Sequence, residues 1–173
     1  MLWPTAGAGE VAIIRITELI WLGDSYDALN ANLKENGITA VVNCAVDLNL
    51  ERWSNLLCVE GFRIPHFVDG VEYVQIGLVD GPGNAMAVYH AVLLKLCSLL
   101  MSKKSVLVHD HEMDSRASAV VIMALHALHR RGWDHWLGVI RGKTDNPDLM
   151  PHPEHRRAFN RINWRLISSV LDG

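Results

Sequence analysis

The eight residues from His109 to Arg116 (HDHEMDSR) constrain the fold of this chain more than any other segment. They stand between a short apolar run at 105–108 (SVLV) and a long, alanine-rich apolar run at 117–131. The first run is typical of a buried strand and the second of a buried helix. A loop that leaves a strand and opens a helix presents backbone N–H groups without helical partners, and the helix dipole adds partial positive charge there. The sequence therefore predicts an anion-binding loop, with Arg116 as a bidentate donor suited to phosphate.

Strand and helix patterns alternate along the rest of the chain. Short β-branched or apolar runs predict strands over 11–16, 19–22, 38–43 and 73–78. Helices are predicted over 24–36, with Asp24 as N-cap and Gly37 as stop, and over 85–101, with Asn84 as N-cap. Further helices are predicted over 133–141 and 153–171, and a short amphipathic one within 48–61. This alternation predicts an α/β fold: a single domain with a central, mostly parallel sheet flanked by helices.

Length and composition exclude several classes of protein. The 173 residues suit one domain, which we assign to 11–173, preceded by a loose Gly- and Ala-rich segment at 1–10. Half of the residues are hydrophobic, and the formal net charge of -3 argues against a nucleic-acid-binding surface. The three cysteines lack metal-type spacing, which predicts reduced thiols in a cytoplasmic protein. We also expect no membrane partner, because no apolar run is long enough to cross a bilayer and no secretory signal is visible.

Four segments occur in the order and approximate spacing found in the dual-specificity branch of the protein tyrosine phosphatase superfamily, which the chain resembles from Ile16 to about Leu171. They are the Leu22-Gly23 strand end, the strand at 37–43 (GITAVVN), the Asp80 loop (DGPGN) and the loop from His109 to Arg116. The most specific pieces are the Val106-Leu107-Val108-His109 approach to the last loop and the Ser115-Arg116 pair that closes it, which together resemble the His-Cys-x5-Arg signature.

The resemblance implies hydrolysis of phosphate monoesters by two-step phosphoryl transfer, without a cofactor, on a phosphorylated protein or a small phosphomonoester. By position, Arg116 matches the phosphate-binding arginine, Asp80 the general acid that protonates the leaving oxygen, and His109 the histidine that precedes the nucleophile. The phosphate-binding loop that the resemblance implies comprises His111, Glu112, Met113, Asp114, Ser115 and Arg116. These roles also have a physical rationale apart from the resemblance, because phosphoryl transfer needs a positioned substrate, charge stabilisation and a proton donor. Oligomeric state is left open.

Three residues depart from the family pattern: Asp110 stands at the nucleophilic cysteine, Met113 at a glycine, and Ala117 at a hydroxyl residue that follows the arginine in many members. A carboxylate is a poor nucleophile toward this ester, and its charge repels a phosphate dianion by roughly 4 kcal/mol at ~4 Å and an effective dielectric near 20. We expect Asp110 to pair with Arg116 and with loop amides as an internal anion. The chain as written is therefore expected to be inactive as a phosphatase.

The sequence leaves several alternatives open. Asp110 is either a natural substitution or one introduced into an otherwise active enzyme, and a carboxylate can also serve as phosphoryl acceptor in an aspartyl-phosphate mechanism. A catalytically dead pseudophosphatase that binds a protein partner is the competing class of function. A metal-dependent phosphohydrolase is a further alternative, because His109, His111 and Asp114 form a His-x-His-x-x-Asp cluster. No second set of ligands accompanies this cluster, so we expect no metal.

Overall fold

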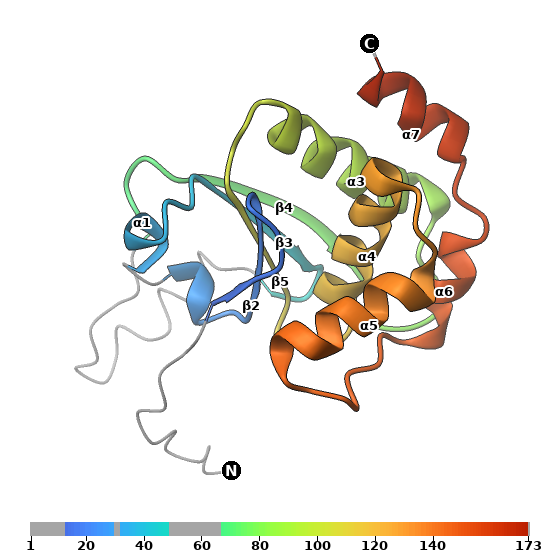
Figure 1. Ribbon diagram of the computed structural model, residues 1–173, viewed down its shortest axis with the longest axis horizontal. Helices are drawn as coiled ribbons and strands as arrows, with labels where there is room; N and C mark the ends of the chain where they lie inside the picture. The colour runs from blue at the N-terminus through green and yellow to red at the C-terminus, as the bar shows by residue number, and fades with distance from the viewer. Residues whose placement is uncertain (1–12, 30–31, 49–66, 173) are drawn as a thin grey trace.

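The computed structural model describes residues 13–29, 32–48 and 67–172 of the chain (Figure 1). The predicted loose segment 1–10 lies outside these residues, as does the predicted helix within 48–61 except for Leu48. The described strands form one sheet in the order β1-β2-β5-β3-β4. Their bounds are Ile14–Arg15 (β1), Ile20–Gly23 (β2), Ala40–Ala45 (β3), Glu72–Leu78 (β4) and Val106–His109 (β5). Only β1 among them runs antiparallel to its neighbour, so the predicted mostly parallel α/β fold is confirmed.

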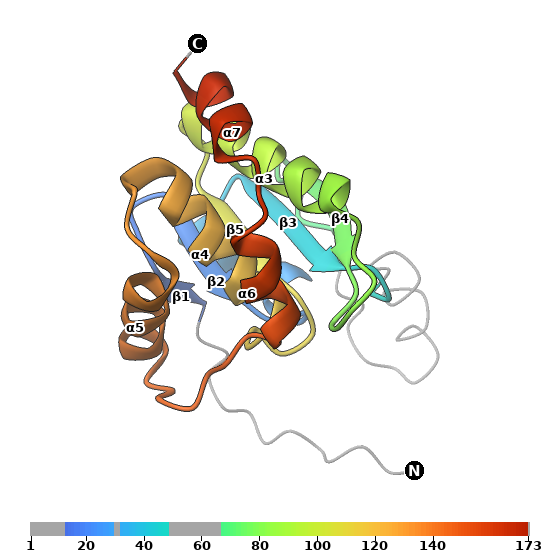
Figure 2. The same cartoon turned by 90° about the vertical axis from the view of Figure 1, so that its right-hand side faces the viewer.

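Helices cover both faces of this sheet. On one face lie α3 (Met86–Met101), α4 (Arg116–His129), α5 (Trp133–Thr144), α6 (Pro153–Phe159) and α7 (Trp164–Leu171), as Figures 1 and 2 show. The other face carries the 3-10 helix η1 (Asp27–Leu29) and the single turn α1 (Asn32–Glu35). No helix in the described ranges has the length and apolar character needed to cross a bilayer.

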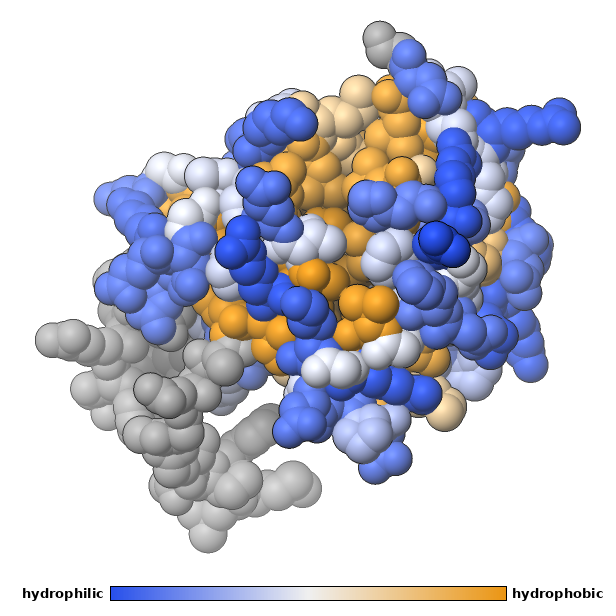
Figure 3. Space-filling view, viewed as in Figure 1, coloured by the Kyte–Doolittle hydropathy of each residue, from blue (hydrophilic) through white to orange (hydrophobic). Residues whose placement is uncertain are grey.

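Alternating residues of the central strands build a core on each side. Val42 and Val108 point into the larger core beneath α3 and α4, whereas Val41 and Leu107 point into a smaller core with Leu33 of α1. Apolar side chains also reach the surface over α3 and α4, where polar side chains surround them (Figure 3). The central strands β2, β3 and β5 are therefore buried on both faces, and their ends and the loops that leave them are the parts that can build a site.

The predicted helix over 24–36 is wrong in the described residues, which contain only η1 and α1. The Asp24 side chain does act as a cap, but it accepts from the amides of Tyr26 and Asp27 at 2.8 and 3.0 Å and so stabilises a tight turn. Gly37 is confirmed as the helix stop: its φ is 71°, and the amide of Ile38 donates to the Leu33 carbonyl at 2.8 Å.

Two further predictions about helix ends need correction. Asn84 does not cap α3, because its side chain instead bonds to the backbone of Val79 and Gly81 and closes the loop that holds Asp80. The single helix predicted over 153–171 is two helices, α6 and α7. Asn163 is the N-cap of α7 and accepts from the Leu166 amide at 3.2 Å, which starts a new helix in a new direction.

Candidate functional site

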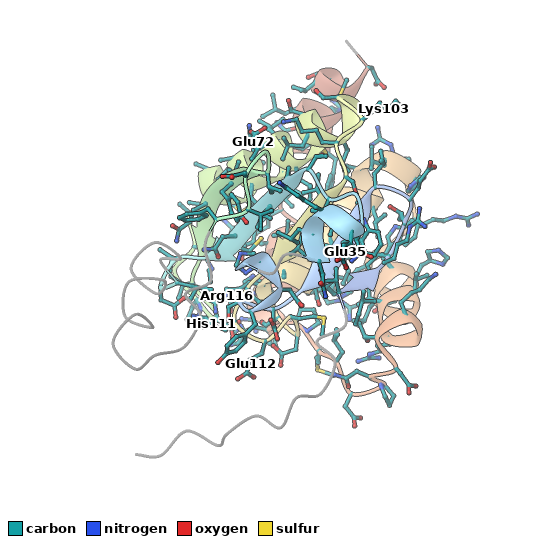
Figure 4. The ribbon with its side chains drawn as sticks, turned by 90° about the vertical axis from the view of Figure 1, so that its left-hand side faces the viewer. Glu35, Glu72, Lys103, His111, Glu112 and Arg116 are labelled. Atoms are coloured by element: carbon teal, nitrogen blue, oxygen red, sulfur yellow. The ribbon has the colours of Figure 1, made fainter. Side chains whose placement is uncertain are left out.

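Three neighbouring strands, β2, β5 and β3, end together at one edge of the sheet. The register places His109 between Gly23 and Asn43, and the predicted loop leaves the sheet at this point. Figure 4 shows the labelled residues His111, Glu112 and Arg116 at this end of the molecule. Because α4 begins at Arg116, the loop joins the carboxyl end of a parallel strand to a helix N-terminus, as the sequence predicts.

The side chain of Asp110 fills the centre of this loop. Asp110 is only 2% exposed, and one carboxylate oxygen accepts from the amides of Glu112 and Met113 at 3.1 and 2.5 Å. The other oxygen accepts from the amide of Ala117 at 3.0 Å. The predicted contacts between Asp110 and backbone amides are therefore confirmed, and this carboxylate occupies donors that a bound anion would use.

Arg116 pairs with a different residue from the one predicted. Its Nη1 donates to Oδ1 of Asp47 at 2.6 Å and to the carbonyl of Leu78 at 3.2 Å, so the predicted Asp110–Arg116 pair is wrong. Burial opposes ionisation of Asp47, but the Arg116 hydrogen bond and the nearby charges outweigh this effect and hold its pKa below the ordinary value. The Nε of Arg116 is buried and has no hydrogen-bond partner among the described residues.

Asp47 is a site residue that sequence reasoning missed. Its second oxygen lies 3.1 Å from Nε2 of His111, so it contacts the loop at two points. The sequence did contain a signal for it, because Asp47 comes two residues after β3 and the carboxyl ends of parallel strands meet at one edge of the sheet.

Asp80 lies beside the loop. Its Oδ1 accepts from the hydroxyl of Ser115 at 2.5 Å and lies 3.6 Å from Nε2 of His155. The Ser115 oxygen in turn accepts from the amide of His152 at 3.1 Å. No pattern in the sequence pointed to His155, which reaches the site from α6 across the fold.

His109 is fully buried beneath the loop. Its Nδ1 lies 3.1 Å from the carbonyl oxygen of Asp110, and since a carbonyl only accepts, Nδ1 carries the hydrogen. Burial lowers the pKa of His109 to about 4, so the ring is neutral near pH 7. A neutral donor in this position orients the loop without adding charge.

Met113 adopts a left-handed backbone conformation, with φ of 71°. This is the position at which the resemblance implies a glycine, and left-handed backbone costs a residue with a Cβ roughly 1 kcal/mol or more. The Met113 carbonyl accepts from the hydroxyl of Ser118, which helps hold the strained turn. The loop therefore keeps the glycine-type turn although it lacks the glycine.

The mouth of the loop is acidic. Glu112 and Asp114 are exposed, and burial followed by the charge of Asp110 raises the pKa of Asp114, with Glu112 and Asp80 adding to the effect. These acids repel one another and would repel an arriving phosphate dianion.

Within the described ranges, neither a cluster of metal-ligand residues nor a substitute cysteine accompanies the loop. No group of three or more His, Cys, Asp or Glu there could hold a metal ion, and His109 and His111 contact different partners. Cys44 on β3 is fully buried, and burial and then the charge of Asp110 raise its pKa above the ordinary thiol value. Cys44 therefore stays a thiol and cannot replace the missing nucleophile.

Comparison with known proteins finds likeness in structure only. No protein-family profile and no curated protein sequence matches the chain. Among solved structures, DUSP15 has a TM-score of 0.71 at 16% identity over 92% of each chain. A mouse putative dual-specificity phosphatase complexed with zinc tungstate has a TM-score of 0.71 at 18% identity over 96% of each chain.

A third similar structure is the human tyrosine phosphatase-like serine/threonine/tyrosine-interacting protein. It has a TM-score of 0.66 at 18% identity, and the match covers 86% of this chain and 93% of that one. Identities this low establish architecture and not activity. In architecture, the chain has the fold of the dual-specificity phosphatases.

Proposed function

We propose that this chain is a catalytically silent domain of the dual-specificity phosphatase type, a pseudophosphatase that binds a protein partner. One observation carries the proposal: the carboxylate of Asp110 already occupies three amide donors of the phosphate-type loop. A phosphate group would have to displace a buried anion that belongs to the chain itself.

The chemistry of the loop supports the proposed lack of catalytic activity. Phosphoryl transfer in this fold needs a nucleophile beneath the phosphate, and Asp110 holds a carboxylate there whose two oxygens both accept hydrogen bonds. Engaged lone pairs are weaker nucleophiles, which also disfavours an aspartyl-phosphate route. Repulsion between this carboxylate and a phosphate dianion ~4 Å away is roughly 4 kcal/mol, which weakens binding by nearly a thousandfold.

Binding of a partner is supported by the surface around the loop and by one similar structure. The exposed acids Glu112 and Asp114 give the mouth a polar, charged rim that is suited to contacts with another protein. The human structure described above is named as a phosphatase-like interacting protein, and the present chain shares its fold.

A latent phosphatase is the second candidate, and a specific observation favours it. Arg116 is buried, its Nε has no hydrogen-bond partner in the part of the chain that the structure describes, and Asp80 lies against Ser115 at the loop. In this candidate only Asp110 blocks an otherwise complete site, and the cysteine version would hydrolyse a phosphorylated protein or a small phosphomonoester.

Hydrolysis of para-nitrophenyl phosphate tests both candidates. We expect no turnover by the chain as written. Asp110→Cys is the diagnostic variant, with Asp110→Cys/Arg116→Ala as its matched control. Activity in the single variant that is lost in the double variant would establish a latent phosphatase. If both variants are inactive, residues of the loop besides Asp110 also prevent catalysis. Turnover by the unchanged chain that disappears in Asp110→Asn would contradict silence and favour the aspartyl-phosphate route.

A further inference from the structure

Packing does not fix the loop that carries Asp80. Gly81 and Gly83 have φ of 154° and 101°, and a Cβ placed on either would meet no atom within 4 Å. A hollow of about 40 Å³ separates this loop from α6, and its lining includes both glycines, Asn84, Tyr89 and Arg157. Since the loop lies beside open space, polar contacts must decide where the Asp80 carboxylate sits.

One side chain bonds that carboxylate on the side of the phosphate-type loop, and a second faces it with a buried ring nitrogen that has no hydrogen-bond partner among the described residues. Ser115 donates its hydroxyl to Oδ1 of Asp80, and Nε2 of His155 lies 3.6 Å from the same oxygen. Ser115 belongs to the phosphate-type loop itself. His155 belongs to α6 and is fully buried, so the imidazole is a fixed point from which the Asp80 carboxylate can be directed.

Tyr89 determines which ring nitrogen of His155 carries the hydrogen. Its hydroxyl lies 2.8 Å from Nδ1 of His155. Burial raises the pKa of Tyr89 to about 12, so the phenol keeps its proton. Because the Asp80 carboxylate oxygen that faces Nε2 of His155 only accepts, the Tyr89 O–H donates to Nδ1 and leaves the ring hydrogen on Nε2. Burial also lowers the pKa of His155 and keeps the ring neutral, which places its single N–H on Nε2, facing Asp80.

We propose that His155 is a positioning residue for Asp80. In this arrangement Tyr89 fixes the imidazole tautomer, the Nε2–H group is directed at the carboxylate, and Asp80 is held against Ser115. The inference goes beyond the proposed function, because it concerns the Asp80 loop whichever residue occupies position 110. A protein partner would then bind residues at the loop mouth that are already positioned, and in an Asp110→Cys variant the Asp80 carboxyl group would already lie beside the loop.

Amide hydrogen exchange of the chain as it stands tests this proposal. The reporters are the amides of Val79, which donates to Oδ1 of Asn84 at 2.8 Å, and Gly81, which donates to the Val79 carbonyl at 3.0 Å. His155→Leu keeps a bulky side chain but removes the N–H, and we expect exchange at both reporters to rise roughly tenfold while α5 amides stay unchanged. His155→Gln keeps an N–H donor and should restore protection to within about threefold of the original chain.

The nitrogen chemical shifts of the His155 ring provide a second readout that a merely structural role would not move. We expect the Nε2–H tautomer in the original chain and its loss in Tyr89→Phe. Unchanged reporter exchange in His155→Leu would overturn the proposal, as would an equal rise throughout α5, which would indicate general destabilisation. An Nδ1–H tautomer in the original chain would overturn it as well. None of these measurements depends on phosphate binding or turnover, so they can fail independently of the proposed function.

Discussion

Replacing Asp110 with serine should convert the phosphate-type loop into an anion site. The substitution removes a charge that is 2% exposed and frees three amide donors, while the short serine side chain leaves room for a tetrahedral oxyanion. Removing a repulsion of roughly 4 kcal/mol corresponds to a gain in affinity approaching a thousandfold. Because Asp110 is buried, solvent screens little of this term.

Tungstate binding followed by isothermal titration calorimetry would measure the gain. The control is Asp114→Asn, which removes an exposed charge from the same loop; screening should limit its effect to about 1 kcal/mol, or roughly fivefold. Asp110→Ser/Arg116→Ala should lose the affinity gained, because it also removes the buried guanidinium beside the loop. If Asp110→Ser binds tungstate no better than Asp114→Asn, the idea that Asp110 fills the anion site is refuted.

Two predictions concern stability. A Cβ on Gly77 of β4 would lie 2.2 Å from the Cα of Val46, so Gly77→Ala should lower the free energy of unfolding by about 2–4 kcal/mol. Gly138 lies on an open face of α5, so Gly138→Ala should raise the free energy of unfolding by about 0.5–1 kcal/mol. Urea denaturation of the two variants measures both changes. Burial raises the pKa of Asp27 to about 6 from 3.8, so the folded state holds this proton more tightly and stability falls as pH rises through that window. Asp27→Asn should therefore stabilise the fold by about 1–2 kcal/mol near pH 7.5 and hardly at all near pH 4, and equal melting-temperature shifts at both pH values would contradict this.

The phosphate-type loop could be predicted because its signals are local. A buried-strand run, a polar loop and an apolar helix follow one another directly, and the structure has β5, the loop and α4 in that order. The contacts between Asp110 and the amides of Glu112, Met113 and Ala117 are equally local, since all three donors lie within seven residues of Asp110.

Contacts between distant segments could not be predicted in the same way. Asp47 and Arg116 are 69 residues apart and meet only because β3 and β5 are neighbours in the sheet. Arg116 therefore pairs with Asp47, which is more exposed than Asp110, while backbone amides donate to the Asp110 carboxylate. The contact between His155 and Asp80 could not be predicted for a related reason. It forms only because the helix predicted over 153–171 is divided into α6 and α7 and because α6 packs near α4.

Local patterns in the chain thus determined that an anion-type loop forms, where it lies on the sheet, and that an aspartate stands at its centre. Tertiary structure decided which acid holds Arg116, which buried histidine faces Asp80, and which part of the last helical segment turns toward the site. The physical reason is that hydrogen bonds and propensities within a few residues are written in the local sequence, whereas pairings between strands and helices depend on how the whole sheet is ordered and covered.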